Sequence, residues 1–214
     1  MRTVKEPDVR RLEILEAAKR LFLKQTYDTT TTNDVMRVLG IAKGTIYHYF
    51  PSKDHLLDAV VEHMAEAYVT RRLEAVEACT GGALAKMRVL FNRDARNAEE
   101  RSATASLHQA GNVTLHTRLL VSLVQRLAPV FAQLIRDGCA EGVFRTEHPL
   151  EVAEILLSGI QFLTDEGVHP WSTVDRTRRL RAVPTLVETL LAAKAGSFAF
   201  LDPGRAGARR GRSS

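Results

Sequence analysis

The sequence has few of the features on which secreted and membrane proteins depend. Only two of its 214 residues are cysteine, and Cys79 and Cys139 stand apart, without the CxxC spacing of a metal or redox motif. Isolated thiols are typical of the reducing cytosol, with a thiol redox switch as the alternative. No run of about 18 apolar residues is present, as a membrane span would need, and the N-terminus lacks the apolar core of a signal peptide. We therefore expect a cytoplasmic protein without a membrane span.

Aromatic residues are also scarce, at 6% of the chain, and no segment shows a convincing alternation of apolar and polar residues, as in a β-strand. Hydrophobic residues make up 45% and charged residues 26% of the chain, which is the composition of an ordinary globular protein. Leucine and alanine are frequent, and both favour helices. The sequence predicts an all-α fold of one or two domains.

Motifs of catalysis are missing too. The sequence contains no phosphate-binding loop, no cofactor fingerprint, and no nucleophile with a base at a recognisable spacing. We therefore expect a protein that is not an enzyme and that needs no cofactor. A helical enzyme that uses Asp, Glu and His side chains, and a scaffold for a protein partner, are the alternatives.

The net charge of +5 is concentrated at the C-terminus. Residues 201–214 contain four arginines and one aspartate and so supply +3, which leaves +2 for residues 1–200. This stretch is too polar to form a core, and we expect it to be a disordered basic tail. Charge alone is therefore weak support for a nucleic-acid partner.

The most informative part of the chain begins at Thr31. Thr31 is placed to cap the first turn of a helix, and Asp34 follows three residues later, in the position of a capping box. Apolar residues then recur at helical spacing, at Val35, Val38 and Leu39. Gly40 comes next, where a helix end often needs a positive φ. The pattern predicts a short helix that ends in a tight turn.

A second short helix is predicted over residues 42–50, because Pro51 disfavours helical backbone in the residue before it. One side of this helix is apolar, formed by Ala42, Ile46, Tyr49 and Phe50. The other side is polar, basic and aromatic, formed by Lys43, Gly44, Thr45, Tyr47 and His48. A rigid helix with such a face suits the major groove of DNA, with a solvated helical corner as the alternative.

The two helices are part of a longer pattern of residues that runs from position 11 to position 57 without a gap in the match. It comprises Ile14, Leu15, Ala17, Ala18, Leu21, Phe22, Tyr27, Thr29–Thr32, Gly40, Ile41, Lys43–Phe50, Ser52 and Lys53. In this order the set resembles the TetR/AcrR family of bacterial transcriptional regulators. Thr26 departs from the family pattern, which usually has glycine there, and Ala42 stands in place of a capping serine. An alanine cap loses about 1 kcal/mol relative to serine.

The resemblance implies an N-terminal three-helix, helix-turn-helix DNA-binding domain over 1–52 and a C-terminal helical ligand-binding and dimerisation domain over 53–200. With the polar face, it predicts DNA contacts from Thr32, Asn33, Lys43, Gly44, Thr45, Tyr47, His48 and Lys53. It also implies a homodimer through the last two helices, near 149–167 and 174–194, where wide apolar stripes support it. Such a dimer places two recognition helices about 34 Å apart and predicts a near-palindromic operator.

Further helices are expected over 8–24, 53–78, 83–96, 98–110 and 113–140. The helix over 53–78 is expected to run from one domain into the other and so to transmit movement between them, as a lever. Asn112 is predicted to cap the helix over 113–140, and Pro129 should kink or split it. In the first helix, Leu12, Leu15, Ala18 and Phe22 are expected to face inward.

A lever transmits a signal only if a ligand prefers one arrangement of the dimer, so the second domain is expected to bind a small-molecule effector. A hydrophobic pocket would suit apolar residues of the central helices. The candidates for its lining, each of which alternatively belongs to the plain core, are Met64, Tyr68, Met87, Phe91, Leu107, Phe131, Phe162 and Trp171.

A divalent metal is the alternative effector. Imidazole and carboxylate ligands from several helices are how helical bundles build metal sites, and the candidates here are His63, His108, His116, Asp165 and His169. Their spacing matches no metal motif, and a polar rim to an organic pocket is the other interpretation. We therefore predict a ligand-responsive DNA-binding regulator, a repressor released from its operator by a small molecule, with metal-responsive regulation as the alternative.

Overall fold

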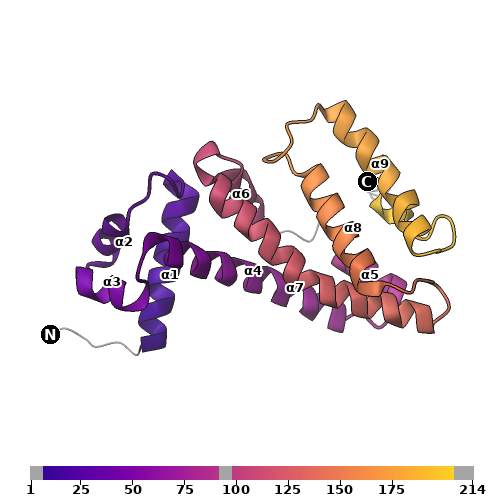
Figure 1. Cartoon of the computed structure of the whole chain (residues 1–214), viewed down its shortest axis with the longest axis horizontal. Coiled ribbons are helices and arrows are strands. Elements are labelled where there is room, and N and C mark those ends of the chain that lie inside the picture. Colours follow the sequence, from indigo (N-terminus) through magenta and orange to yellow (C-terminus); the bar gives the residue numbers. More distant parts are fainter. Residues whose placement is uncertain (1–6, 92–97, 205–214) are drawn as a thin grey trace, which may run out of the picture. The chain divides into compact units, whose positions relative to one another are not determined.

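The computed structural model describes residues 7–91 and 98–204, except for the side chains of residues 98–101. The described chain contains helices and no strand, so the all-α prediction is confirmed. The elements are α1 (Pro7–Gln25), α2 (Thr32–Leu39), α3 (Lys43–Tyr49), α4 (Lys53–Glu77), α5 (Ala83–Leu90), α6 (Ala98–Leu107), η2 (Ala110–Asn112), α7 (Val113–Ala140), α8 (Pro149–Thr164), α9 (Thr173–Leu190) and η3 (Ala199–Leu201) (Figure 1). The predicted basic tail falls almost wholly outside the described residues.

Contacts group the chain into two compact units. The first unit joins the described residues of 1–67 to those of 96–122, and the second unit joins 68–95 to 123–214. Helices α4 and α7 therefore each begin in the first unit and end in the second. The predicted functional division at residue 52 stays a prediction, because the first unit holds α1–α3 together with the first part of α4, α6, η2 and the start of α7.

The first unit is built around α1. Its buried side is formed by Ile14, Leu15, Ala17, Ala18 and Phe22, and α2 packs against it. Leu12, which was expected to face inward, is exposed. Leu12 lies two residues before Ile14, where the buried stripe begins, so the predicted periodicity is correct but the stripe does not reach as far as Leu12.

Helix α2 begins and ends as predicted. The Thr31 hydroxyl accepts a hydrogen bond from the Asp34 amide, and the Asp34 carboxylate accepts one from the Thr31 amide at 2.8 Å, which completes a capping box. The hydrogen bond from the Thr31 hydroxyl lowers the pKa of Asp34, so the carboxylate stays charged at the positive helix end. Gly40 has φ of 62° and closes the helix. Val38, expected on the apolar stripe, is exposed, and Val35 is buried.

Helix α3 is seven residues long and buries Ile46, with Phe50 buried just after its end. Ala42 takes the N-cap position with extended backbone and makes no side-chain hydrogen bond. Both short helices can be followed at the indigo end of Figure 1.

The turn from α1 to α2 contains a strained residue. Thr26 has φ of 71°, in the left-handed region that costs a residue with a Cβ about 1–2 kcal/mol. This is the position at which the TetR/AcrR pattern usually has glycine. The Thr30 hydroxyl donates to the Thr26 carbonyl at 2.6 Å, and the Thr29 hydroxyl donates to the Gln25 carbonyl. These bonds hold the turn in its strained shape.

Side chains of α4 join the rest of the first unit. The Arg118 guanidinium on α7 bridges Asp54 and Asp58, at 2.8 Å and 2.6 Å. His63 pairs with Glu16 of α1 at 2.6 Å. Burial would raise the pKa of Glu16, but the hydrogen bond from His63 and the charge of Lys19 outweigh it and lower the pKa.

Helix α7 is the longest element, and Pro129 does not split it. Ala128 and Phe131, on either side of the proline, are buried in the core of the second unit, so tertiary packing offsets the lost backbone hydrogen bond. The segment Ala110–Ala140 is long and apolar enough to span a membrane by length and composition. Half of its apolar window is buried within the protein, as in a core helix.

The unfilled cap of α3 generates a stability prediction. Ala42→Ser supplies a hydroxyl that can accept a hydrogen bond from the backbone amide of Gly44 or Thr45, so we expect the free energy of unfolding to rise by about 1 kcal/mol. Urea unfolding followed by circular dichroism measures the change. Ala42→Val is the control, because valine lacks the hydroxyl and is as poor an N-cap as alanine. An Ala42→Ser protein no more stable than the parent would contradict the cap assignment.

Candidate nucleic-acid interface

The predicted DNA-contacting side of α3 lies at the surface. Lys43, Gly44, Tyr47 and His48 are exposed, and Thr45 is half-buried. Ile46, on the opposite side, is 0% exposed, whereas Tyr47 next to it is 39% exposed. The helix thus has one side committed to the core and one side open to a partner.

Gly44 has no internal reason to be glycine. Its φ is not in the left-handed region, and a Cβ added there would meet nothing within 4 Å. A residue without a side chain at an open helical position lowers helix stability, since glycine is about 1 kcal/mol less favourable than alanine. Its benefit is that an external surface can approach the backbone closely.

Tyr47 is held in place by residues of both short helices. Its hydroxyl lies 3.2 Å from the Thr32 hydroxyl at the start of α2. The Lys43 ammonium lies 5.8 Å from the centre of its ring. Two of the predicted contact residues therefore orient a third, which reduces the side-chain entropy that binding would cost.

Lys53 is fixed at the start of α4. Its ammonium lies 4.1 Å from the centre of the Tyr27 ring and donates to the Asp28 carbonyl at 3.3 Å. Partial burial lowers the pKa of Lys53, against the opposing effect of the Asp28 charge. Burial also raises the pKa of Tyr27, helped by the Asp54 carboxylate. Lys53 therefore has a structural role, and its contact with DNA stays a prediction. Asn33 is exposed beside the N-terminus of α2.

The candidate effector-pocket residues are divided between the units. Met87, Phe131, Tyr68 and Phe91 gather in the core of the second unit. The Phe91 and Phe131 rings lie 4.9 Å apart, edge to face, and the Arg72 guanidinium lies 4.2 Å from the centre of the Tyr68 ring.

The other four candidates lie elsewhere. Met64 and Leu107 belong to the first unit. Phe162 is half-buried on α8. Trp171 is exposed, and the centre of its ring lies 3.7 Å from the guanidinium of Arg179 and 5.2 Å from the centre of the His169 ring.

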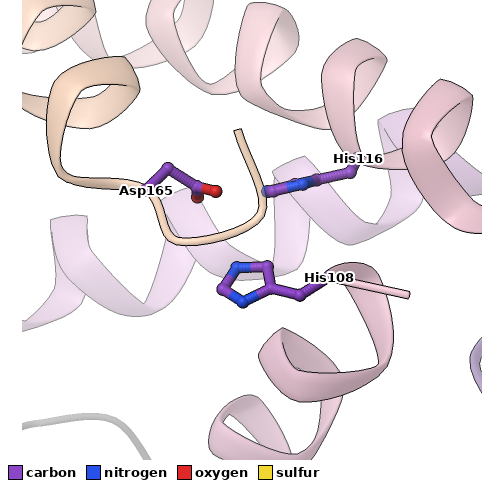
Figure 2. A group of neighbouring side chains, drawn as sticks. All are labelled: His108, His116 and Asp165. Atoms are coloured by element: carbon purple, nitrogen blue, oxygen red, sulfur yellow. The ribbon is translucent and has the colours of Figure 1, made fainter. Parts of the chain in front are cut away.

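Two of the five candidate metal ligands come together within one unit. The rings of His108 and His116 lie 5.1 Å apart in the first unit, and Figure 2 shows them together. Asp165, also labelled there, belongs to the second unit. His63 pairs with Glu16, and His169 stacks on Trp171.

Two polar residues of the first unit were missed or misassigned from the sequence. Arg118, which bridges two carboxylates of α4, was not singled out. The Asn112 side chain was expected to cap α7, but it reaches α1 and α6 instead, through bonds to Phe22 and Ser106. No local pattern reveals a partner 90 residues away.

Comparison with known proteins agrees with this geometry. Residues 14–60 match the family model described as bacterial regulatory proteins, tetR family. Residues 95–185 match the model described as tetracyclin repressor-like, C-terminal domain. The HTH-type transcriptional repressor KstR2 of Mycolicibacterium smegmatis is 25% identical over 149 residues, which cover 68% of this chain and 72% of that protein.

Other relatives agree with the family models. The HTH-type transcriptional regulator LmrA of Bacillus subtilis is 38% identical over 71 residues, which cover 33% of this chain and 38% of LmrA. The structure of the fatty acid degradation regulator FadR from Bacillus halodurans shares the fold, with a TM-score of 0.59 and 19% identity over 94% of this chain and 98% of that one. These named relatives are regulators rather than enzymes. The metal-responsive alternative is not favoured. The chain therefore belongs to the tetR family of bacterial regulatory proteins and is a DNA-binding transcriptional regulator.

Proposed function

We propose that this regulator is a cytoplasmic repressor that binds a near-palindromic operator as a homodimer and leaves it when a small molecule binds the second domain. The observation that carries the proposal is the outer side of α3, where Tyr47 is exposed yet held by Thr32. A helix presented in this way enters the major groove, where side chains reach base edges.

The exposed side chains suggest separate roles. Tyr47 and His48 carry groups that read base edges, whereas Lys43 and Lys53 carry charges that suit phosphates. Thr32 and Asn33 stand in the first turn of α2, where short polar side chains can donate to phosphate oxygens. Specificity is thus assigned to Tyr47 and His48, and general affinity to Lys43 and Lys53.

Tyr47→Ala and His48→Ala should each weaken operator binding by about 1–3 kcal/mol, as expected for lost base contacts. Lys43→Ala should weaken binding to all DNA and reduce the salt slope by about 1. Fluorescence anisotropy with the gene's own upstream DNA, over a range of salt, measures both effects. His148→Ala is the control, since His148 is an exposed histidine outside the first unit. Normal operator binding by both Tyr47→Ala and His48→Ala would refute the assignment of base contacts to these residues.

The homodimer is supported by the apolar side of α8 and α9. Ile155 on α8 is 62% exposed and Leu186 on α9 is 58% exposed. Leu163 and Leu190 continue the two stripes at helical spacing, and both are exposed. A Cβ added at Gly159, between Ile155 and Leu163, would meet nothing within 4 Å, so α8 leaves room for a close helix. A second copy that presents the same two helices would bury these stripes in a four-helix bundle.

Ile155→Glu and Leu186→Glu should each convert the dimer to a monomer, because a carboxylate in an apolar interface loses its hydration. Light scattering after size-exclusion chromatography reports the mass. Val143→Glu is the matched control, an exposed apolar residue outside α8 and α9. If the two helix variants remain dimers, the interface lies elsewhere.

The effector is proposed to be an apolar small molecule bound in the second unit. Tyr68, Met87, Phe91 and Phe131 supply aromatic and thioether surface, and Arg72 supplies a cationic group beside Tyr68. A pocket that opened among these side chains would take a hydrophobic ligand with a polar anchor.

Thermodynamic linkage gives a strict test of the effector. A compound found by thermal shift should lower operator affinity by some factor, and saturating operator DNA should lower the affinity for that compound by the same factor. Titration calorimetry with and without DNA measures the reciprocal effect. A compound that binds without any reciprocal change is a passive ligand and not the effector.

A further inference from the structure

The strained turn between α1 and α2 is held by a segment that lies far away in the sequence. Gly111 accepts a hydrogen bond from the Asp28 amide at 3.0 Å. Asn112 accepts one from the Tyr27 amide at 2.6 Å. Two successive amides of the turn are thus bound by two successive residues of η2, and all four residues lie within the first unit.

The Asn112 side chain is completely buried and fully used. It is 0% exposed, and its amide group donates to the Phe22 carbonyl at 3.0 Å and to the Ser106 carbonyl at 2.9 Å. With the bond from Tyr27, both donors and the acceptor oxygen are engaged. Two carbonyl partners and one N–H partner allow only one orientation of the amide group. This side chain therefore ties the end of α1 to the end of α6.

Gly111 and Thr26 fit each other sterically. A Cβ added at Gly111 would lie 2.8 Å from the Thr26 Cβ and closer still to the Thr26 hydroxyl. No side chain at position 111 fits against Thr26 in this position. The threonine that departs from the family pattern therefore occupies space that a glycine 85 residues later leaves open.

We infer that Gly111 and Asn112 form a latch that positions the DNA-binding helices, with Asn112 as a positioning residue for operator recognition. The latch fixes the turn, and α2 begins only a few residues later, at Thr32. The orientation of α2 and α3 relative to η2 and the first part of α7 is therefore set here. This inference rests on the DNA-binding function and not on the identity of the effector.

The latch also connects the region that matches the C-terminal family model directly to α1 and to the turn that leads into α2. Ser106, Gly111 and Asn112 lie within residues 95–185, whereas Phe22 and Tyr27 lie within 14–60. A change in α6 or α7 can therefore reach α1 through η2, without passing along α4. Specific binding requires correctly placed recognition helices, whereas nonspecific binding depends mainly on charge. Loss of the latch should therefore weaken specific binding much more than nonspecific binding.

A compensating pair of substitutions tests the latch. Gly111→Ala should raise the operator Kd about tenfold, because its methyl group displaces Thr26. Thr26→Gly removes the obstructing atoms and accepts the positive φ, so the double variant should bind within about twofold of the parent. All variants should bind random DNA within about twofold of the parent at equal salt. The full-length dimer and fluorescence anisotropy are used throughout.

Three results would overturn the inference in a parent that binds its operator. They are unchanged operator binding by Gly111→Ala, a double variant as weak as the single one, and an equal loss on operator and random DNA. A parent that shows no operator binding would instead contradict the proposed function. If Gly111→Ala does not fold, the double variant must still fold and bind.

Hydrogen exchange tests the latch without DNA. The amides of Tyr27 and Asp28 should be protected in the parent. Asn112→Asp sets a carboxylate against the Phe22 and Ser106 carbonyls, so it should speed exchange of the Tyr27 amide while the core of the second unit stays protected. Fast exchange of Tyr27 and Asp28 in the parent would show that the latch does not form.

Discussion

A helix of seven residues has no useful stability of its own in water, since isolated helices shorter than about 12–15 residues are marginal. Helix α3 therefore exists only because its neighbours hold it. Ile46 and Phe50 are buried on its inner side. The turn at Gly40 joins α3 to α2, and the capping box of Thr31 and Asp34 stabilises the start of α2. Since the buried packing lies on the inner side, the outer side can carry exposed residues such as His48, and even Gly44, which lowers helix stability. The predicted DNA-contacting residues can stay exposed because one side of this short helix is buried and the other is not.

The helices that hold α3 are themselves held by contacts with elements outside α1–α3. The end of α1 is tied to η2, and α4 is tied to α7 by Arg118. As a result, the compact units do not follow the two family models, because part of the C-terminal region belongs to the unit that holds the DNA-binding helices. The effector proposed for the second unit would need a route to the operator. Two features of the described chain could supply it under that proposal: helix α4, which begins in the first unit and ends in the second, and the hydrogen bonds between η2 and the turn after α1.

Local signals were enough to predict most helix boundaries. Capping at Thr31, the left-handed glycine at position 40 and the stop at Pro51 all act over a few residues and were recognised correctly. Periodicity was less reliable at the edges of a stripe, as Leu12 and Val38 show, because it gives the direction of a face but not the extent of the core that covers it. Asn112 was assigned to a cap because asparagine suits that position; the buried carbonyls that compete for its side chain lie on other helices.

The same residue has a consequence for how the protein is made. The bonds from Asn112 to Tyr27 and Phe22 span 85 and 90 residues, so they cannot form until more than half of the chain has been synthesised. Domains generally fold as they emerge from the ribosome, N-terminal part first. The first three helices would then fold early around α1, with their connecting turn still unsupported. A nascent chain would acquire the finished DNA-binding surface only after η2 had emerged, which delays operator binding until the region that is to control it has begun to fold.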